Sequence, residues 1–402
     1  MQTLPFAAAQ QSAPKSAGPA AGGSSLPRGA SQAQDEWDAA RELHAQVWRH
    51  DLEMVLVFIS PRYDRARLAT ALNAMFGETP VVGCTTAGEI TPFGYQDGAV
   101  TGVGFPKAEF SIVAELIPDI DRFEISHGAA VLRSVLKQRN IPPAGLPGGG
   151  KEQGSFAFLM IDGMSTREEL VVSALHNVLV GVPLFGGSAG DDLKFENTFI
   201  LHGGRFHTNA AVLMLFTTTR RFSVFRTEHF VSSGRKMVVT GADPQRRVVT
   251  EINAEPAGPE YARMVGLEGV ELTPMVFAAH PVVVRVGGEY HVRSIQKVNE
   301  DESLSFFCAI DEGIVLTVAE GVDIVENLQA LMKRLEAEVG PPDLVLSCDC
   351  ILRRLEIEQR QLTQPIAEIM RKNNAIGFNA YGEQYSAMHV NQTLTGVAIG
   401  RR

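Results

Sequence analysis

The sequence is poor in cysteine and has no long apolar run. Its 402 residues include 4 cysteines. They are too few and too unevenly spaced for a disulfide framework, which suits a reducing compartment and predicts a cytoplasmic protein. No apolar run approaches the roughly 20 residues that span a bilayer, so we expect no membrane insertion.

Basic residues are also in short supply. Asp and Glu total 46 against 36 Lys and Arg, which gives a net charge of -10. Nucleic-acid surfaces depend on clustered Lys and Arg that contact phosphates, so the composition argues against a nucleic-acid partner. With 45% hydrophobic residues, a chain of 402 residues can bury a large core and form two domains.

The first 34 residues are mostly Ala, Ser, Gly, Pro and Gln. Such a segment buries too little apolar surface to offset its ordering entropy, which predicts a disordered tail over 1–34. It lacks the basic start and the longer apolar stretch of a signal peptide.

One pattern occurs three times: apolar residues, a glycine-rich turn, then Gly followed by a carboxylate. The copies are "VVGCTTAGEI" from Val81, "VPLFGGSAGDD" from Val182 and "AIGFNAYGEQ" from Ala375. Gly190 minus Gly88 is 102, and Gly382 minus Gly88 is 294. We therefore expect these three glycines at equivalent corners of a repeated unit.

Each copy reads as strand, helix, strand, glycine turn and further strand. This predicts a mixed α/β fold in which repeated units form mixed sheets with packed helices. Several β-rich runs separate the second copy from the third, so we place a boundary near residue 240. The expected domains are 35–240 and 241–402.

The glycine turns allow a structural and a functional interpretation. They can be tight corners of the repeat, or they can let a ligand approach the backbone. None has the Lys-[Ser/Thr] of a phosphate loop or GxGxxG spacing. Glu89, Asp191 and Glu383 either line a shared cleft or accept hydrogen bonds within their own turns.

The cysteines raise an enzymatic alternative. Cys84 in "GCTTAG" stands at a strand-to-turn position that can expose a nucleophile, which with the turn carboxylates would suit a hydrolase or transferase. Cys348 and Cys350 lack the other ligands of a zinc site and are predicted to be buried thiols. Arg353 is expected to face a ligand or to pair with a carboxylate.

Together with "SCDCILRR" and the ending "GFNAYGEQYSAMHVNQTLTGVAIG", these motifs resemble the FIST sensory family, with FIST N and FIST C parts, from about Met54 to the end. The resemblance implies a non-enzymatic, ligand-binding sensor of bacterial signal transduction. "GRFH" and the ending are similar to the nitric-oxide-sensing haem proteins of this family, which regulate separate histidine kinases or cyclic-di-GMP enzymes. A sensor of amino acids or related metabolites is the alternative.

The resemblance implies haem b, and because the chain has no CxxCH motif the haem would be held non-covalently. His389 is expected as the ligand of the haem iron and His207 is second, although Val390 separates His389 from "NQT". We expect the turns to line one cleft between the domains. The remaining candidate site residues are Gly88, Gly187, Ser188, Gly190, Arg353, Tyr381, Gly382 and Glu383.

Overall fold

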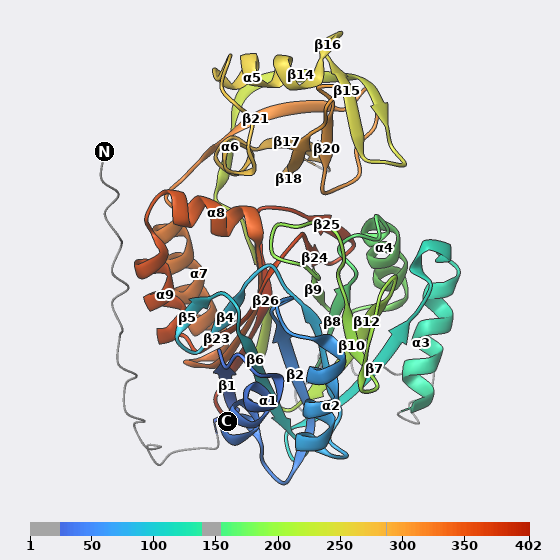
Figure 1. Ribbon diagram of the computed structural model, residues 1–402, viewed down its shortest axis with the longest axis vertical. Helices are drawn as coiled ribbons and strands as arrows, with labels where there is room; N and C mark the ends of the chain where they lie inside the picture. Colours follow the sequence, from blue (N-terminus) through green and yellow to red (C-terminus); the bar gives the residue numbers. More distant parts are fainter. Residues whose placement is uncertain (1–24, 139–153, 287) are drawn as a thin grey trace.

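The computed structural model describes residues 25–138, 154–286 and 288–402. It consists of a larger body and a smaller unit that sits on one end of it (Figure 1). The smaller unit is the continuous segment from Phe230 to Gly321, and the chain before and after it forms the body. We call this segment the inserted unit.

The body contains three copies of one repeat. Each copy has an edge strand, a helix, an inner strand, a second helical segment, a strand ending at the glycine turn, a short hairpin and a return strand. The first repeat comprises β1(Arg28–Ser31), α1(Glu36–Val47), β2(Leu52–Ile59), α2(Arg65–Phe76), β3(Val81–Thr85), β4(Glu89–Thr91), β5(Gly94–Gln96) and β6(Val100–Pro106).

The other two repeats follow the same order, and the third contains the inserted unit after its edge strand. The second comprises β7(Phe110–Ile117), η1(Ile120–Arg122), α3(His127–Gln138), β8(Gly154–Ile161), α4(Glu168–Val178), β9(Leu184–Ser188), β10(Ile200–His202), β11(Arg205–His207) and β12(Ala211–Thr218). The third comprises β13(Phe222–Thr227), α7(Ile324–Val339), β22(Pro342–Cys350), α8(Ile351–Gln359), α9(Thr363–Lys372), β23(Ala375–Ala380), β24(Glu383–Tyr385), β25(Met388–Val390) and β26(Leu394–Gly400).

Strand pairing is the same in all three repeats. The inner strand runs parallel to the strand before the glycine turn and antiparallel to the return strand: β2 with β3 and β6, β8 with β9 and β12, and β22 with β23 and β26. The predicted mixed α/β fold with mixed sheets is confirmed.

Each repeat places its hairpin on the sheet of another repeat. The hairpin β4–β5 pairs with β23, β10–β11 pairs with β3, and β24–β25 pairs with β9. Every repeat thus completes a six-stranded sheet that belongs to a different repeat. This exchange links segments that are hundreds of residues apart in the sequence.

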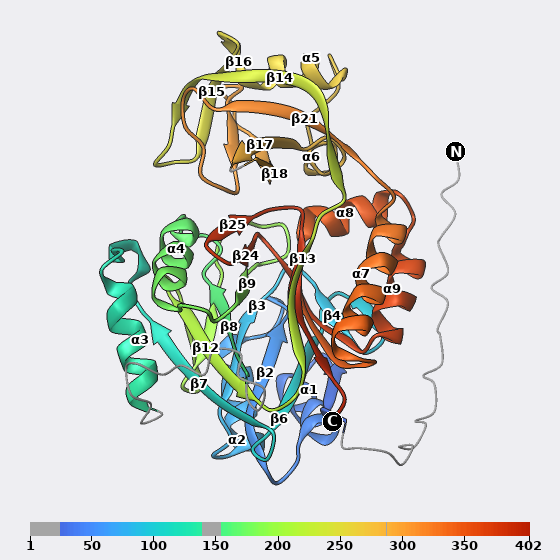
Figure 2. The same cartoon turned by 180° about the vertical axis from the view of Figure 1, so that it is seen from behind.

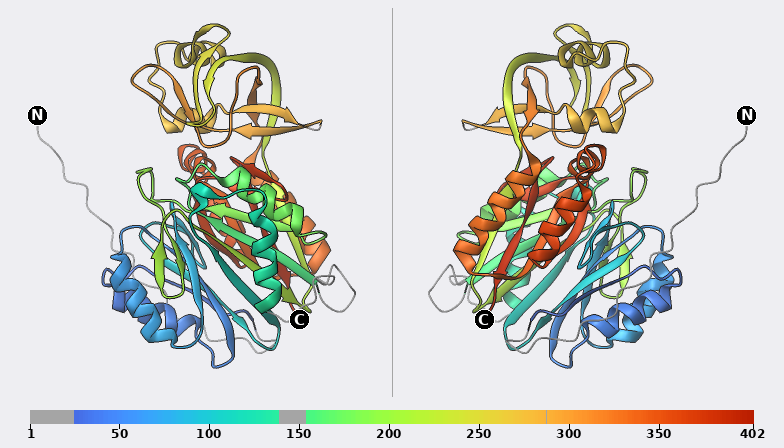
Figure 3. Two further views of the ribbon diagram at one scale, coloured as in Figure 1. Left: turned by 90° about the vertical axis from the view of Figure 1, so that its right-hand side faces the viewer. Right: turned by 90° about the vertical axis from the view of Figure 1, so that its left-hand side faces the viewer.

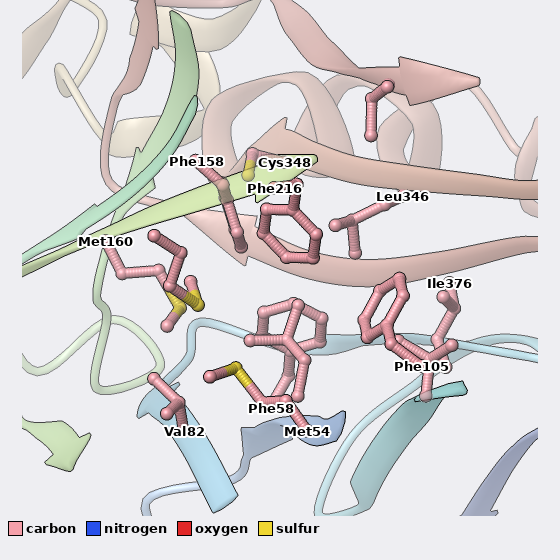
Figure 4. Close-up of a cluster of buried hydrophobic side chains, with 14 of the residues drawn as sticks. Met54, Phe58, Val82, Phe105, Phe158, Met160, Phe216, Leu346, Cys348 and Ile376 are labelled. Carbon is pink, nitrogen blue, oxygen red and sulfur yellow. The ribbon is translucent and has the colours of Figure 1, made fainter. Parts of the chain in front are cut away.

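The three sheets enclose a common core (Figure 4). Phe58 of the first repeat stacks on Phe378 of the third at 4.8 Å between ring centroids. Helices α1 and α2, α3 and α4, and α7 and α9 cover the outer faces. Because both faces of each sheet are buried, the inner strands are continuous apolar runs such as "MVLVFI".

The inserted unit has a sheet and a hydrophobic core of its own. It lies over the end of the body where α8, β24 and β25 are found (Figures 2 and 3). Its elements are β14(Phe230–Asp243), β15(Val248–Ile252), β16(Glu255–Pro256), α5(Ala257–Val265), α6(Pro274–Ala279), β17(Val282–Val286), β18(Glu289–Arg293), β19(Ile295–Val298), β20(Leu304–Phe306) and β21(Val315–Gly321).

Two sequence-based boundaries need correction. The division at 240/241 lies inside β14, and the chain from Ile324 onward returns to the body as the third repeat. The predicted disordered tail also extends too far, because β1 pairs with β6 and the Leu26 N–H donates to Asp343 at 3.0 Å. Composition misled here because a short edge strand is stabilised by partners far along the chain. Residues 1–24 lie outside the described residues.

Across residues 25–138, 154–286 and 288–402, no helix combines the length and apolar character needed to cross a membrane.

Phe378→Ala tests the common core. Truncating this buried ring removes its stacking on Phe58 and leaves a cavity, so the free energy of unfolding should fall by about 3–5 kcal/mol in urea denaturation. Phe93→Ala is the matched control, because Phe93 is 60% exposed and its loss should change stability by less than about 0.5 kcal/mol. Equal effects of the two changes would contradict a core shared by the repeats.

Candidate functional site

The three glycine turns meet at the end of the body beneath the inserted unit. Backbone hydrogen bonds join each pair of turns: Ala87 N to Asn379 O at 2.9 Å, Gly190 N to Thr85 O at 3.0 Å, and Ser188 N to Gly382 O at 2.8 Å. We call this closed arrangement the turn ring. It brings Gly88, Gly190 and Gly382 to equivalent corners of the three repeats, as predicted.

The turn ring is packed and does not line an open cleft. A Cβ on Gly190 would lie 2.7 Å from the backbone nitrogen of Ala87, so no space for a ligand separates these turns. Gly187 faces the common core, where a Cβ would lie 2.7 Å from the Phe378 ring. Gly88 has a φ of 129° and lies against the Arg354 guanidinium. The expectation of a cleft between the turns is wrong, because backbone hydrogen bonds close the ring.

The turn carboxylates stabilise their own loops. Asp191 accepts hydrogen bonds from three successive backbone N–H groups, those of 195, 196 and 197, at 2.8 to 2.9 Å. Glu89 accepts from the Ala99 N–H at 2.9 Å, and Glu383 accepts from the Thr393 hydroxyl at 2.8 Å. Of the two roles considered for these residues, the structure supports the one within each turn.

The hairpins that follow the turns differ in chemistry. At the middle of the second hairpin strand stand Tyr95, Phe206 and His389, and their partners across the hairpin are Ile90, Leu201 and Gln384 respectively. The first two hairpins therefore pair an aromatic with an aliphatic residue, whereas the third pairs two polar residues. Tyr95 donates its hydroxyl hydrogen to Asp349, so its polar atom is satisfied.

His389 is buried and incompletely paired. Its Nδ1 lies 3.3 Å from the Gln384 side-chain nitrogen, which leaves Nε2 as the second polar atom of the ring. That Nε2 has no hydrogen-bond partner among the described residues. Burial lowers the pKa of His389, which keeps the imidazole neutral. A Cβ on Gly382 would lie 2.6 Å from Nε2, so glycine is needed there to make room for the ring.

Other buried polar side-chain atoms of this hairpin and its loop also lack a hydrogen-bond partner among the described residues: Glu383 Oε1, Gln384 Oε1, both amide atoms of Asn391, and Gln392 Oε1. We call Gln384, His389, Asn391 and Gln392 the amide cluster; all four are at most 3% exposed. Buried polar groups in folded proteins nearly always have partners, so this cluster requires water or a ligand.

The inserted unit covers the amide cluster. Gln392 donates to the Ala278 carbonyl oxygen of α6 at 2.7 Å. A buried ion pair holds the unit nearby: Arg247 donates to Glu168 at 2.7 Å and to Glu169 at 2.5 Å, both at the start of α4. Glu169 also accepts from the Ala309 N–H at 2.6 Å. The cluster therefore lies at the boundary between the inserted unit and the body.

Arg353 pairs with a carboxylate, one of the two roles expected for it. Its Nε donates to Asp349 at 2.9 Å and its Nη1 to His229 Nδ1 at 2.9 Å, while Nη2 has no partner among the described residues. His229 in turn donates from Nε2 to Glu356 at 2.7 Å. Arg353 thus belongs to a buried network where the chain enters the inserted unit, not to the amide cluster.

The remaining predicted residues are divided between the cluster and other places. Ser188 accepts from the Gln384 amide at 3.0 Å and so supports the cluster. The Tyr381 hydroxyl donates to Asp191, and its ring packs between Phe195 and Phe307. His207 lies on the second hairpin, with Nε2 3.1 Å from the His202 carbonyl oxygen, and is not part of the cluster.

The cysteine geometry gives no support to a nucleophile. Cys84 is fully buried in the common core together with Cys348, and burial raises the pKa of both thiols well above the usual value. Cys350 is equally buried. The prediction of buried thiols at Cys348 and Cys350 is consistent with this placement.

The surroundings of His389 do not fit a haem group. A haem needs an apolar slot beside its axial ligand, but His389 is 3% exposed and its neighbours are amides. Two open pockets of about 480 and 650 Å³ have other linings, which include Arg62, Asp97 and Arg354 in one and Asn73, Glu78 and His202 in the other. Haem binding stays a prediction that a spectrum can test.

Sequence reasoning missed Gln384, Asn391, Gln392, Glu169 and Arg247. A signal for Gln384 was present, because the repeat offset of 294 places this glutamine at the position of Ile90. A buried apolar position that becomes polar in one copy of a repeat marks a change of role. Arg247 and Glu169 carry no comparable signal, since their pairing joins two distant elements.

Glu89→Gln tests the buried turn carboxyl. Burial raises the pKa of Glu89 from 4.5 to about 8. The folded protein therefore holds this proton while the unfolded chain has lost it, so the stabilisation is complete below pH 4.5 and is lost as pH rises toward 8. In urea denaturation between pH 5 and 8, the free energy of unfolding should fall less steeply in the variant. The exposed Glu78→Gln should keep the wild-type slope, and an unchanged slope in Glu89→Gln would contradict the assignment.

Comparison with known proteins identifies the family of this chain. A FIST N domain matches residues 53–255 and a FIST C domain matches residues 257–386. An uncharacterized protein of Methanocaldococcus jannaschii is 21% identical over 90% of this chain and 76% of its own length. The crystal structure of a cyanuric acid hydrolase from A. caulinodans aligns with 93% of this chain and 98% of its own, at 9% identity and a TM-score of 0.34. Since the FIST N match alone covers half of the chain, the protein belongs to the family of sensory proteins that combine a FIST N and a FIST C domain.

Proposed function

We propose that this protein is a non-enzymatic sensor that binds a small ligand at the amide cluster. Binding would be passed to a separate signalling protein, a histidine kinase or a cyclic-di-GMP enzyme. Membership of the FIST family supports the sensory role, because FIST domains are associated with small-ligand sensing in signal transduction. The partners come from the resemblance of the sequence to the nitric-oxide-sensing branch.

One observation carries the location of the site. The third hairpin replaces the apolar pair found in the other two with Gln384 and His389, and it leaves Gln384 Oε1 and His389 Nε2 unpaired among the described residues. Nothing in the backbone of the repeat requires this, because Ile90 and Tyr95 form the same hairpin. Unpaired buried polar atoms cost about 1–3 kcal/mol each, so their retention in one place favours a binding role.

Haem that senses nitric oxide is a finer form of this proposal. Its support is the unpartnered Nε2 of His389, an imidazole nitrogen of the kind that binds haem iron. The polar neighbours of His389 favour the alternative, a polar metabolite. Both forms share the site and the sensory role.

Exchanging the third hairpin for the chemistry of the first tests the site. The double change Gln384→Ile and His389→Tyr should leave the fold intact but abolish ligand binding, because it restores the apolar pair of Ile90 and Tyr95. The full chain is purified, denatured, and its released small molecules identified by mass spectrometry. Ile90→Leu is the control, and we expect it to release the same molecule as the wild type. Equal release from the exchanged variant would contradict the site.

An absorption spectrum with added haem tests the finer form. A haem sensor should gain a Soret band at one haem per chain, and the band should shift or weaken in His389→Ala but not in His207→Ala. If the wild-type protein shows no Soret band, haem is excluded as the ligand and the polar metabolite is the form of the proposal that stays. Since the spectrum does not depend on a bound metabolite, it separates the two forms.

Arg247→Met tests whether the ion pair holds the inserted unit over the cluster. The change leaves Glu168 buried without its partner, which should cost about 3–5 kcal/mol. The Ala309 N–H, which is bonded to Glu169, should then exchange hydrogen faster in a mass-spectrometric exchange experiment. Arg41→Met removes an exposed pair with Asp38 and should change stability by less than about 1 kcal/mol. Unaltered exchange at Ala309 would show that other contacts hold the unit.

A further inference from the structure

An open pocket of about 480 Å³ lies beside the turn ring, where the three repeats meet. We call it the junction pocket. Its volume falls within the range of sites for small ligands, and none of its described lining residues belongs to the amide cluster. The lining comes from all three repeats and includes Asp97 and Gly98 of the first, Asp192 and Leu193 of the second, and Arg354 of the third.

The guanidinium groups of the junction pocket already have acceptors. Arg354 donates to Glu358 and to Asp97 at 2.8 Å each, and it also donates to an amide oxygen at 3.1 Å. Arg62 donates from Nη2 to the carbonyl oxygens of residues 32 and 33 at 2.9 and 2.7 Å. A ligand anion at Arg354 would compete with two carboxylates, so the pocket is poorly suited to an acid.

The carboxylate of Asp192 has no hydrogen-bond donor among the described residues. The side chain is half-buried, and burial raises the pKa of Asp192, to which the nearby charge of Asp97 adds. Lys194 acts on Asp192 through its charge, but it is exposed and donates no hydrogen bond to it. An ammonium group in the pocket would supply the missing donor and compensate the partly buried charge.

The described lining combines a small negative charge with apolar surface. It holds three carboxylates and two guanidinium groups, a net charge of -1 when all are ionised. The apolar part comes from Leu193, Ile351 and Leu355, and Leu193 is 43% exposed. A ligand with one positive group and an apolar body would compensate this charge and remove apolar surface from water.

We propose that the junction pocket binds an organic cation, an amine that carries one positive charge and an apolar body. The ammonium group donates to Asp192, and the apolar body packs on Leu193 and Leu355. Because α8 lines the pocket and also packs against α6 of the inserted unit, an occupant contacts a helix on which that unit rests. This site is additional to the proposed function, and its test does not depend on the amide cluster.

The test uses the full chain and three probes of one shape that differ in charge. At neutral pH benzylamine is a cation, benzyl alcohol is neutral and benzoate is an anion. Binding is measured by ligand-observed NMR titration, and we expect benzylamine to bind more tightly than the other two. Asp192→Asn keeps the shape of the side chain, and asparagine tolerates the positive φ of 63° at this position. This variant should weaken benzylamine by about ten-fold or more, the loss expected for one hydrogen bond to a charged group.

Asp119→Asn is the matched control, because Asp119 also has a positive φ, of 52°, and is exposed outside the described lining of the pocket. It should bind benzylamine like the wild type. The double change Gln384→Ile and His389→Tyr should do the same, so a failure of the amide cluster as a site is distinguishable from a failure of this one. The proposal is overturned if benzylamine does not bind, if benzyl alcohol or benzoate binds equally well, or if Asp192→Asn keeps the wild-type affinity.

Discussion

The hydrogen bonding of each hairpin to the sheet of another repeat is the constraint on which the rest of the structure depends. Each hairpin completes the sheet of another repeat, so no repeat forms a six-stranded sheet by itself. The hairpins are β4–β5, β10–β11 and β24–β25. The same exchange forces the three glycine turns together, where backbone atoms of one turn lie against those of the next. Glycine is therefore needed at these corners because a side chain would clash with neighbouring residues, and not because a ligand must reach the backbone.

A frame built from backbone hydrogen bonds allows side chains to diverge between repeats. The three hairpins keep one geometry, and even their loops share a positive φ, at Gly98, Asn209 and Gln392. Within that geometry Ile90 and Tyr95 fill space, whereas Gln384 and His389 bring polar atoms into a buried place. The first two hairpins can therefore be compared directly with the third, and only the third carries a polar pair at this position.

The repeats and their corners could be predicted from sequence because they depend on local patterns and constant spacing. The offsets of 102 and 294 residues placed Gly88, Gly190 and Gly382 correctly. The exchange of hairpins could not be predicted, since pairing between β23 and β4 leaves no local trace. For the same reason the boundary near 240 failed: β14 is one strand, and the return of the chain at Ile324 is a property of tertiary structure. His389 was predicted from its motif and the offset of 294 marks Gln384, whereas the contact of Gln392 with Ala278 depends on the packing of the inserted unit on the body.

The inserted unit and the body together bury the amide cluster. The unit joins the body through two adjacent crossings, where the Val322 N–H donates to the His229 carbonyl oxygen at 2.7 Å. His389 is 3% exposed beneath it, and Arg247 and Gln392 form contacts between the unit and the body. His229 is bonded to Arg353, which is bonded to Asp349, the partner of Tyr95 in the first hairpin. These contacts form a buried network that connects the crossing into the inserted unit with the first repeat.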